Sequence, residues 1–385
     1  MVKISRRGAN RLKEGHVWVY RSDIVAAEGI AAGALVGVAD ERGKFLGTAL
    51  YSSASQIAIR MISREAVKDF NGLLRKRIQE AIAYRERVVR ETDAYRIVFS
   101  EADFLPGLIV DRYNDLLSLQ VLTQAMDTEA VREVIVSELG EQLKPAAIAE
   151  RVDPRVRELE QLPARSSSLL QGEKKSTVFS MNGVRFHHEA FEGQKTGAFL
   201  DQRENYGAAA QYARGEALDV FCYQGAFALH LAQHCSKVTG VDSSRPALEV
   251  ADRNAALNGR GIEWIEANAF DLLRDYANAG QQYDTIVLDP PAFAKSKSNL
   301  ETALRGYKEL NLRALKMLRP GGILVTCSCS YHVSPTDFLD VVAQASQDMH
   351  RNLRMVENRT QAKDHPMLLT VPETAYLKCV VVVVS

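Results

Sequence analysis

The sequence lacks the features that would place it in several specialised classes of protein. Its 385 residues contain no run of about 18 apolar residues, the length that a membrane-spanning helix needs. No basic segment followed by an apolar run opens the chain, so no secretory signal is predicted. Its five cysteines show no repeated spacing and no C-x-x-C pair, which argues against a disulfide framework and against zinc ligands. We therefore expect a cytoplasmic protein with free thiols, no membrane association and no metal.

An excess of charge of one sign is also absent. Lysine and arginine number 48, as do aspartate and glutamate, so no global basic field indicates a nucleic-acid partner. A local basic patch does lie within the first 22 residues, where Arg6, Arg7 and Arg11 are among six basic side chains against one acid. Such a patch is as compatible with an ordinary solvated surface as with an RNA-contacting face.

The length and the changing sequence pattern of the chain predict three domains, because 385 residues exceed the size that a single hydrophobic core usually serves. Residues 24–62 alternate short apolar runs with glycines, which predicts a small β-barrel, and a helical period begins near residue 70. Residues 151–176 are polar and unpatterned, which predicts a loop. The predicted domains are an N-terminal barrel at 1–70, a central α+β domain at 71–178 and a C-terminal domain at 179–385.

Strands and helices alternate through the C-terminal domain, from ALDVFCY (217–223) onward. This alternation predicts an α/β fold with a parallel, doubly wound, Rossmann-like sheet. The final segment, AYLKCVVVVVS (375–385), predicts one more buried strand because β-branched residues fit a sheet interior.

The dinucleotide-binding signature GxGxxG is missing after the first of these strands, where Gly225 is the only glycine of ALDVFCYQGAF (217–227). One glycine allows close approach by an uncharged part of a ligand, and S-adenosylmethionine (SAM) has no phosphate to bind. Four polar residues lie at the carboxyl ends of successive strands, where open α/β sheets bind ligands: Asp219, Asp242, Asn268 and Asp271. Asp242, 23 residues after Asp219, suits ribose hydroxyls, and Asn268 with Asp271 suits the adenine edge. Taken alone, Asp219 fits a loop-capping acid better.

Five motifs occur in a specific order: KTGAFLDQRENYG (195–207), ALDVFCYQGAFALHLA (217–232), VTGVDSS (238–244), YDTIVLDPPAFAKSK (283–297) and LVTCSCSYHV (324–333). Together they resemble the series of the bacterial 23S ribosomal RNA 5-methylcytosine methyltransferases of the large-subunit methyltransferase I type. The resemblance extends to GHVWVYRSDI (15–24) and SEADFLPGLIVDRYND (100–115), and so to essentially the full chain. It implies an N-terminal PUA domain, a SAM-dependent C-terminal domain and further cofactor contacts from Thr196, Asp201, Phe221 and Asp289. It also implies an RNA partner, 23S rRNA or a ribosomal precursor particle, and suggests a homodimer.

Methylation of cytosine C5 requires a thiolate to attack C6 and an acid to protonate N3, because C5 is a poor nucleophile. Asp289 of LDPPAF is the candidate for the N3 contact, in a loop that Pro290 and Pro291 stiffen. Phe293 is placed to stack on a flipped base. Lys295 and Lys297 follow it, either as RNA phosphate contacts or as solvated charges.

Cys327 and Cys329 are the candidate thiols, and in an extended strand both would point to one face. Alignment with the LV-x-x-T-C-S run of related RNA enzymes puts Cys329 at the position of the nucleophile and Cys327 deeper in the strand. A C-x-C pair considered alone is more often two small buried hydrophobic residues than a reactive centre. Ala292 occupies the position where the other branch carries a second cysteine, so the base that removes H5 is unassigned. Two alternatives stay open: methylation of an exocyclic amino group without any thiol, and a non-catalytic RNA-binding assembly factor.

Overall fold

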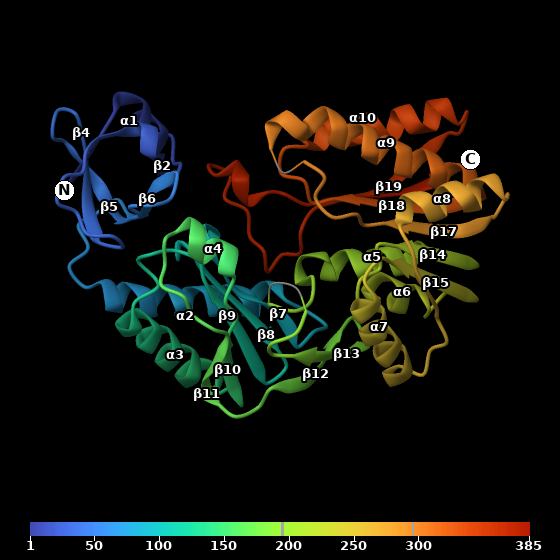
Figure 1. Ribbon diagram of the computed structural model, residues 1–385, viewed down its shortest axis with the longest axis horizontal. Coiled ribbons are helices and arrows are strands. Elements are labelled where there is room, and N and C mark those ends of the chain that lie inside the picture. The colour runs from blue at the N-terminus through green and yellow to red at the C-terminus, as the bar shows by residue number, and fades with distance from the viewer. Residues whose placement is uncertain (194–195, 295) are drawn as a thin grey trace. The chain divides into compact units, whose positions relative to one another are not determined.

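The computed structural model describes residues 1–193, 196–294 and 296–385, without the side chain of Lys297. It divides into two compact units, each described here by itself (Figure 1). The first comprises Met1–Phe179, His188–Ala198 and Lys363–Thr374, and the second comprises Ser180–His187, Phe199–Ala362 and Ala375–Ser385. The predicted C-terminal domain was one continuous range, whereas two of its segments, 188–198 and 363–374, fold with the first unit. None of the described helices is long and apolar enough to cross a membrane.

The N-terminal part of the first unit is a six-stranded sheet in the order β2-β6-β5-β4-β1-β3. Its elements are β1 (Val2–Ile4), α1 (Arg6–Lys13), β2 (Trp18–Tyr20), β3 (Ile24–Ala26), β4 (Leu35–Asp40), β5 (Phe45–Tyr51) and β6 (Ile57–Ser63). The glycines allow sharp bends: Gly47 has φ of 143°, and a Cβ there would lie 2.2 Å from the carbonyl oxygen of Ser63. The glycine-punctuated segment therefore forms the strands of a small β domain, as predicted.

The central part of the first unit is a five-stranded sheet in the order β11-β10-β9-β8-β7, and α2 and α3 pack against it through one apolar core. Its elements are α2 (Phe70–Val88), β7 (Ala94–Phe99), β8 (Leu108–Tyr113), β9 (Leu116–Val121), α3 (Glu129–Leu143), β10 (Ala147–Glu150), α4 (Pro154–Leu159) and β11 (Ser168–Gly172). The prediction of a loop over 151–176 was wrong. Asp153 caps α4 by accepting N–H bonds from Arg155 and Val156, and β11 pairs antiparallel with β10.

A seven-stranded sheet forms the second unit, in the order β16-β15-β14-β17-β18-β20-β19. The pairs from β16 to β18 are parallel, as predicted, but β20 and β19 run antiparallel, so the sheet is mixed. Its strands are β14 (Glu216–Val220), β15 (Lys237–Asp242), β16 (Glu263–Glu266), β17 (Tyr283–Leu288), β18 (Leu318–Ser328), β19 (Leu353–Arg359) and β20 (Lys378–Val384). The chain enters this unit through a hairpin of β12 (Ser176–Met181) and β13 (Val184–Glu189).

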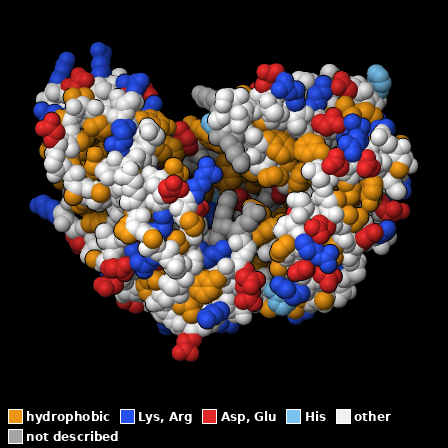
Figure 2. Space-filling view, viewed as in Figure 1, with side chains coloured by type: hydrophobic (Ala, Val, Ile, Leu, Met, Phe, Trp, Pro, Cys, Tyr) orange, Lys and Arg blue, Asp and Glu red, His pale blue; other side chains and the backbone are white. Residues whose placement is uncertain are grey.

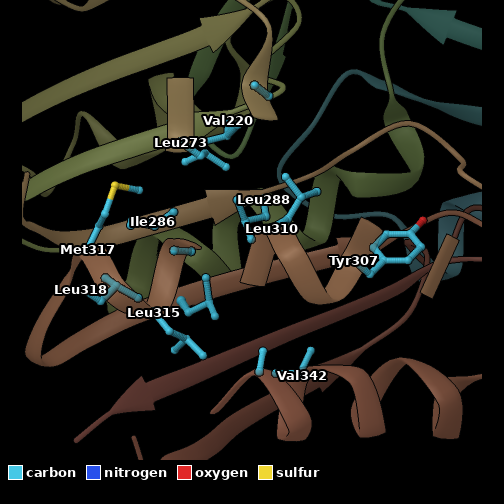
Figure 3. Close-up of a cluster of buried hydrophobic side chains, with 14 of the residues drawn as sticks. Val220, Leu273, Ile286, Leu288, Tyr307, Leu310, Leu315, Met317, Leu318 and Val342 are labelled. Carbon is cyan, nitrogen blue, oxygen red and sulfur yellow. The ribbon is translucent and has the colours of Figure 1, made fainter. Parts of the chain in front are cut away.

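Helices cover both faces of this sheet, which is the predicted doubly wound arrangement (Figure 1). They are α5 (Arg203–Tyr212), α6 (Ala226–Leu231), α7 (Arg245–Leu257), α8 (Ala269–Asn278), α9 (Leu300–Met317) and α10 (Pro335–Asp348). Figure 3 shows the apolar core in which strand residues such as Ile286 and Leu288 meet helix residues such as Leu310 and Leu315. Acidic and basic side chains are interspersed on the face drawn in Figure 2, in keeping with the balanced composition.

The strand order reverses between β14 and β17, because the chain leaves β14 toward β15 and β16 and then returns to β17 on the other side. In open α/β sheets the crevice beside the carboxyl ends at such a switch point binds ligands. The residues that follow β14, β15, β17 and β18 at this edge are therefore the candidates for an active site.

Candidate active site

Asp219 is a buried carboxyl near the end of β14. Its Oδ2 accepts the N–H of Ala228 in α6 at 2.8 Å, and its Oδ1 has no hydrogen-bond partner among the described residues. Burial raises the pKa of Asp219 to about 8, and the charges of Asp289 and Asp242 add to the rise. Asp219 therefore fixes α6 to the strand, and its pKa depends on the charges of the neighbouring carboxyls.

The loop after β14 has a strained backbone, with positive φ at Phe221 (67°), Tyr223 (50°) and Gly225 (81°). A Cβ on Gly225 would lie 2.6 Å from the Trp264 ring and 3.2 Å from Cβ of Ala251. The turn and the packing of Trp264 therefore require a glycine here, and the approach of a ligand at this position stays a prediction. Phe221 and Gly225 do lie in the loop at the sheet edge.

Asp242, the last residue of β15, holds the neighbouring loops through both carboxylate oxygens. Oδ2 accepts the N–H of Tyr223 at 2.9 Å, and Oδ1 accepts the N–H of Ser244 at 2.8 Å. The side chain remains partly exposed. Each oxygen keeps a lone pair that can accept a hydroxyl hydrogen. Its position at the sheet edge and these free lone pairs fit the predicted contact with a ribose.

Asn268 and Asp271 both have structural partners. Oδ1 of Asn268 caps α8 by accepting the N–H groups of Phe270 and Asp271, at 2.9 and 3.3 Å. The carboxylate of Asp271 is exposed and lies 3.0 Å from Nη1 of Arg274. Sequence reasoning missed Phe270, whose ring is 37% exposed with its centroid 5.9 Å from that of Phe293. An exposed aromatic ring beside the cap is a flat apolar surface at the predicted adenine position.

Asp289 follows β17 and lies in a chain of hydrogen bonds that sequence reasoning also missed. Nε2 of Gln202 donates to its Oδ1 at 2.9 Å, Asn205 donates to Oε1 of Gln202 at 2.6 Å, and Arg359 donates to Oδ1 of Asn205 at 2.9 Å. Burial raises the pKa of Asp289 to about 7, and the charge of Asp201 adds to the rise, against the hydrogen bond of Gln202. A carboxyl with this pKa exchanges a proton near neutral pH.

Asp201 lies just before Gln202, in the segment leading to α5. Its Oδ2 accepts the hydroxyl hydrogen of Tyr376 at 2.6 Å, and its carbonyl oxygen accepts the N–H of Ala362 at 2.8 Å. It is thus tied to the segments around β19 and β20 and is close enough to Asp289 to raise that residue's pKa. Thr196, the other residue implied from this motif, belongs to the first unit, where its Oγ1 donates to the buried carboxylate of Asp111.

Cys329 lies beside the loop that follows β17. Its Sγ is 3.8 Å from the carbonyl oxygen of Pro290, and the side chain is partly exposed. The next residue ties the two loops together, since Oγ of Ser330 accepts the N–H of Ala294 at 3.1 Å and lies 2.9 Å from the hydroxyl of Tyr307. The LDPPAF and TCSCS motifs are therefore neighbours at the sheet edge.

Cys327 has a different environment from Cys329. It is fully buried and lies opposite Cys379 of β20, and burial raises the pKa of its thiol well above the usual value. Because β18 ends at Ser328, Cys329 lies beyond the strand and strand alternation no longer fixes its direction. The expectation of one continuous strand through both cysteines was thus wrong, while the deeper burial of Cys327 was predicted. All five cysteines are free, as predicted.

The candidate RNA-contacting residues have mixed environments. Phe293 packs against Tyr307, with ring centroids 4.8 Å apart, and remains partly exposed. Lys295 and the side chain of Lys297 lie outside the described residues. In α1, the Arg7 Nε donates to the buried Asp23 at 2.7 Å and the Arg11 guanidinium lies 4.6 Å from the Tyr20 ring centroid, whereas Arg6 is exposed. Two of the three patch arginines therefore also stabilise the N-terminal domain.

Comparison with known proteins identifies the family. A PUA-like domain model matches residues 2–64, and an S-adenosylmethionine-dependent methyltransferase model matches residues 102–381. The ribosomal RNA large subunit methyltransferase I of Shewanella denitrificans is 39% identical over 98% of this chain and 97% of its own length. That of Photobacterium profundum is 37% identical over 95% of each chain. This chain belongs to the ribosomal RNA large subunit methyltransferase I family.

Solved structures agree with the fold of this family member. A methyltransferase crystallised with SAH matches 100% of both chains with a TM-score of 0.85 at 19% identity. A SAM-dependent methyltransferase from Streptococcus mutans matches equally fully with a TM-score of 0.84 at 19% identity. The predicted PUA-like domain and Rossmann-like methyltransferase domain are thus confirmed, and the protein is a SAM-dependent methyltransferase.

The residues at the sheet edge fit SAM as the cofactor. Asp219, Asp242 and Asp289 have no lysine or arginine within ion-pair distance in the described part of the chain, and the charges of the other two raise the pKa of Asp219. Such an uncompensated group of carboxyls favours a cationic ligand. SAM supplies a methyl group on a positively charged sulfonium sulfur and needs no phosphate-binding loop. Asp242 would hold the ribose, and the apolar ring of Phe270 would lie beside the adenine.

Replacing Asp242 with alanine is expected to weaken SAM binding by about 1–3 kcal/mol, or roughly 5- to 150-fold in dissociation constant, because the ribose hydroxyls would lose a charged hydrogen-bond acceptor. Calorimetric titration measures the change. Asp252→Ala, which removes an exposed carboxylate from α7, is the matched control and should leave the affinity unchanged. Equal affinities for wild type and Asp242→Ala would remove Asp242 from the cofactor site.

Proposed function

We propose that this protein transfers the methyl group of SAM to C5 of a cytosine in 23S ribosomal RNA, through a covalent bond between Cys329 and C6. The observation that carries the proposal is the 3.8 Å distance from Sγ of Cys329 to the carbonyl oxygen of Pro290, the residue after Asp289. A thiol and a carboxyl of raised pKa at one sheet edge are the two groups that C5 chemistry requires. The name of the relatives, ribosomal RNA large subunit methyltransferase I, supports the choice of RNA.

The chemistry of the proposed reaction divides between these two side chains. The thiolate of Cys329 bonds to C6 while Asp289 gives its proton to N3, so the electron pair of the C5–C6 double bond becomes available for C5 to take the methyl group. Asp289 then takes the N3 proton back, H5 leaves as a proton to solvent, the double bond reforms and the thiolate is expelled. Gln202 orients Asp289 through its 2.9 Å hydrogen bond. The homodimer and the cytoplasmic location stay predictions of this proposal.

The direct test of the product is nucleoside analysis. Large-subunit RNA and precursor particles from a strain without the gene would be incubated with the purified protein and isotopically labelled SAM, digested, and analysed by mass spectrometry. The proposal expects label in 5-methylcytidine at one position. Label in a base methylated on its exocyclic amino group would establish the first rival, which the Asp-Pro-Pro sequence at 289–291 also suits. RNA binding without any transfer or SAM binding would establish the non-catalytic rival.

The exposed basic face of α1 is proposed to contact the RNA. Arg6 and Lys13 are both exposed and, being seven positions apart, lie on one face of the helix. Reversing both to glutamate should weaken RNA binding and flatten its dependence on salt, because fewer phosphate counterions are released. Arg7 is left in place because it binds the buried Asp23.

Arg42→Glu with Lys44→Glu is the control for this prediction, because it reverses two exposed charges in the β4–β5 connection of the same domain. Filter binding at several salt concentrations gives both the affinity and its slope. An Arg6→Glu/Lys13→Glu protein that matches the control in both quantities would show that the patch is only a solvated surface. SAM affinity should be the same in all three proteins.

A further inference from the structure

Lys378, the first residue of β20, is a buried lysine that pairs with no carboxylate among the described residues. It is 6% exposed, and in the described part of the chain no carboxylate lies within 4.0 Å of its Nζ. An ammonium group is costly to bury unless it is paired or fully hydrogen-bonded. Packing alone would favour an apolar residue here, as in the five valines that follow in β20. The position therefore calls for an account of why a cation is kept.

The ammonium group of Lys378 is held by three backbone carbonyl oxygens. Nζ donates to those of Ser330 at 2.7 Å, Val333 at 2.9 Å and Tyr376 at 2.9 Å. An ammonium has three N–H donors, so all of them are satisfied in the charged form. Burial lowers the pKa of Lys378 to about 8, which leaves it mainly cationic at neutral pH. Carbonyl oxygens satisfy its donors but do not neutralise its charge.

The three contacts place this charge at the turn that carries Cys329. Lys378 lies opposite Ser328 in the β18–β20 register, and its partners Ser330 and Val333 follow Cys329 in the chain. A negative charge on Cys329 raises the pKa of Lys378, so the two charges interact, and by reciprocity the ammonium favours the thiolate. The turn itself carries the titratable residues Tyr331 and His332, and among the described residues Tyr307, through Ser330, and Asp289, in the loop after β17, lie beside it.

We propose that Lys378 is a positioning residue for Cys329, holding residues 329–333 through three hydrogen bonds and favouring the thiolate by its unneutralised positive charge. The thiol proton passes to solvent, and the freed electron pair of Sγ is the one that would attack C6. The inference rests on the proposed function only for that last step. The acidity of the thiol itself is measurable without RNA.

The test is the pH dependence of alkylation of Cys329 by iodoacetamide, followed by mass spectrometry of the labelled peptide. In the wild type, Cys329 should react well before Cys235, a half-buried thiol whose pKa burial raises to about 11. In Lys378→Met the midpoint for Cys329 should move up by about one pH unit or more, a roughly tenfold slower reaction at pH 7. Lys378→Arg, which keeps the charge, should restore part of the difference. Lys316→Met, on the exposed face of α9, is the matched control and should behave as the wild type.

Each outcome separates the inference from the proposed function. If Lys378→Met loses methylation activity while the midpoint pH for alkylation of Cys329 is unchanged, the lysine has only a structural role and the inference is overturned. The inference is also overturned if wild-type Cys329 is alkylated no faster at pH 7 than free cysteine. This second result does not depend on the Lys378→Met variant, so it decides the question even if a thermal unfolding control shows that the variant does not fold. A shifted midpoint together with full methylation by Cys329→Ala supports the inference about the thiol and rejects covalent catalysis.

Discussion

A protein carrying Cys329→Ala is expected to lose RNA methylation by about 10⁴-fold or more, because removal of an attacking group leaves only binding and orientation. SAM binding should stay within a few-fold of wild type, since the side chains expected to contact the ribose and the adenine, Asp242 and Phe270, do not include Cys329. Transfer of labelled methyl groups to RNA and calorimetric titration of SAM measure the two quantities separately.

Cys327→Ala is the matched control, because it removes the second thiol of the same motif. Cys327 is fully buried against Cys379, so its loss should leave a small cavity and lower the free energy of unfolding by about 1 kcal/mol, with most of the methylation rate retained. The opposite pattern, with Cys327→Ala inactive and Cys329→Ala active, would reverse the roles of the two thiols. Activity in the double variant would favour methylation of an exocyclic amino group.

Asp289→Asn is expected to lower kcat/KM for RNA by about 10²- to 10⁴-fold, because an amide keeps the shape of the side chain but cannot give N3 a proton. The raised pKa also predicts a pH dependence: the protonated carboxyl prevails below about pH 7 and is lost above it, so an alkaline decline of kcat/KM should have its midpoint near 7. In Asp289→Asn this decline should disappear. Rates over a pH series give both quantities.

Asp284→Asn supplies the control for Asp289, because Asp284 lies near the opposite end of β17, the strand that Asp289 follows. Its carboxylate pairs with Arg319, so its loss should affect stability rather than the rate. An Asp289→Asn protein with wild-type kcat/KM and an unchanged pH profile would remove Asp289 from proton transfer. Its SAM affinity, measured alongside, shows whether any loss arises from cofactor binding instead.

Local pattern predicted the elements that depend on nearest neighbours in the sequence. Alternating strands and helices indicated the doubly wound sheet, and the β-branched run near the C-terminus indicated β20. The antiparallel β19 was missed because its residues Leu353–Arg359 are largely exposed and lack the apolar run of a buried strand. The short elements α4 and β11 were missed because a cap and an edge pairing, rather than an apolar pattern, stabilise them.

The candidate site was predictable in its motifs but not in its contacts. Asp242, Asp289 and Cys329 lie at the carboxyl edge that strand order alone specifies. Gln202 and Lys378 were not singled out, since their roles depend on which distant segment lies against them: Gln202 meets Asp289, and Lys378 meets the Cys329 turn through the β18–β20 register. The packing reason for Gly225 was not predictable, because the side chain that excludes a Cβ there, Trp264, is 39 positions along the chain.

The central claim, a covalent bond between Cys329 and the target cytosine, is tested most directly with RNA that carries 5-fluorocytidine. After methyl transfer the fluorine on C5 cannot leave as a proton does, so the bond from Sγ to C6 should persist. We predict a SAM-dependent protein–RNA adduct that survives denaturation in the wild type and in Cys327→Ala, and none in Cys329→Ala. Methylation of ordinary RNA by a wild-type protein that yields no adduct with the fluorinated RNA would contradict the covalent mechanism.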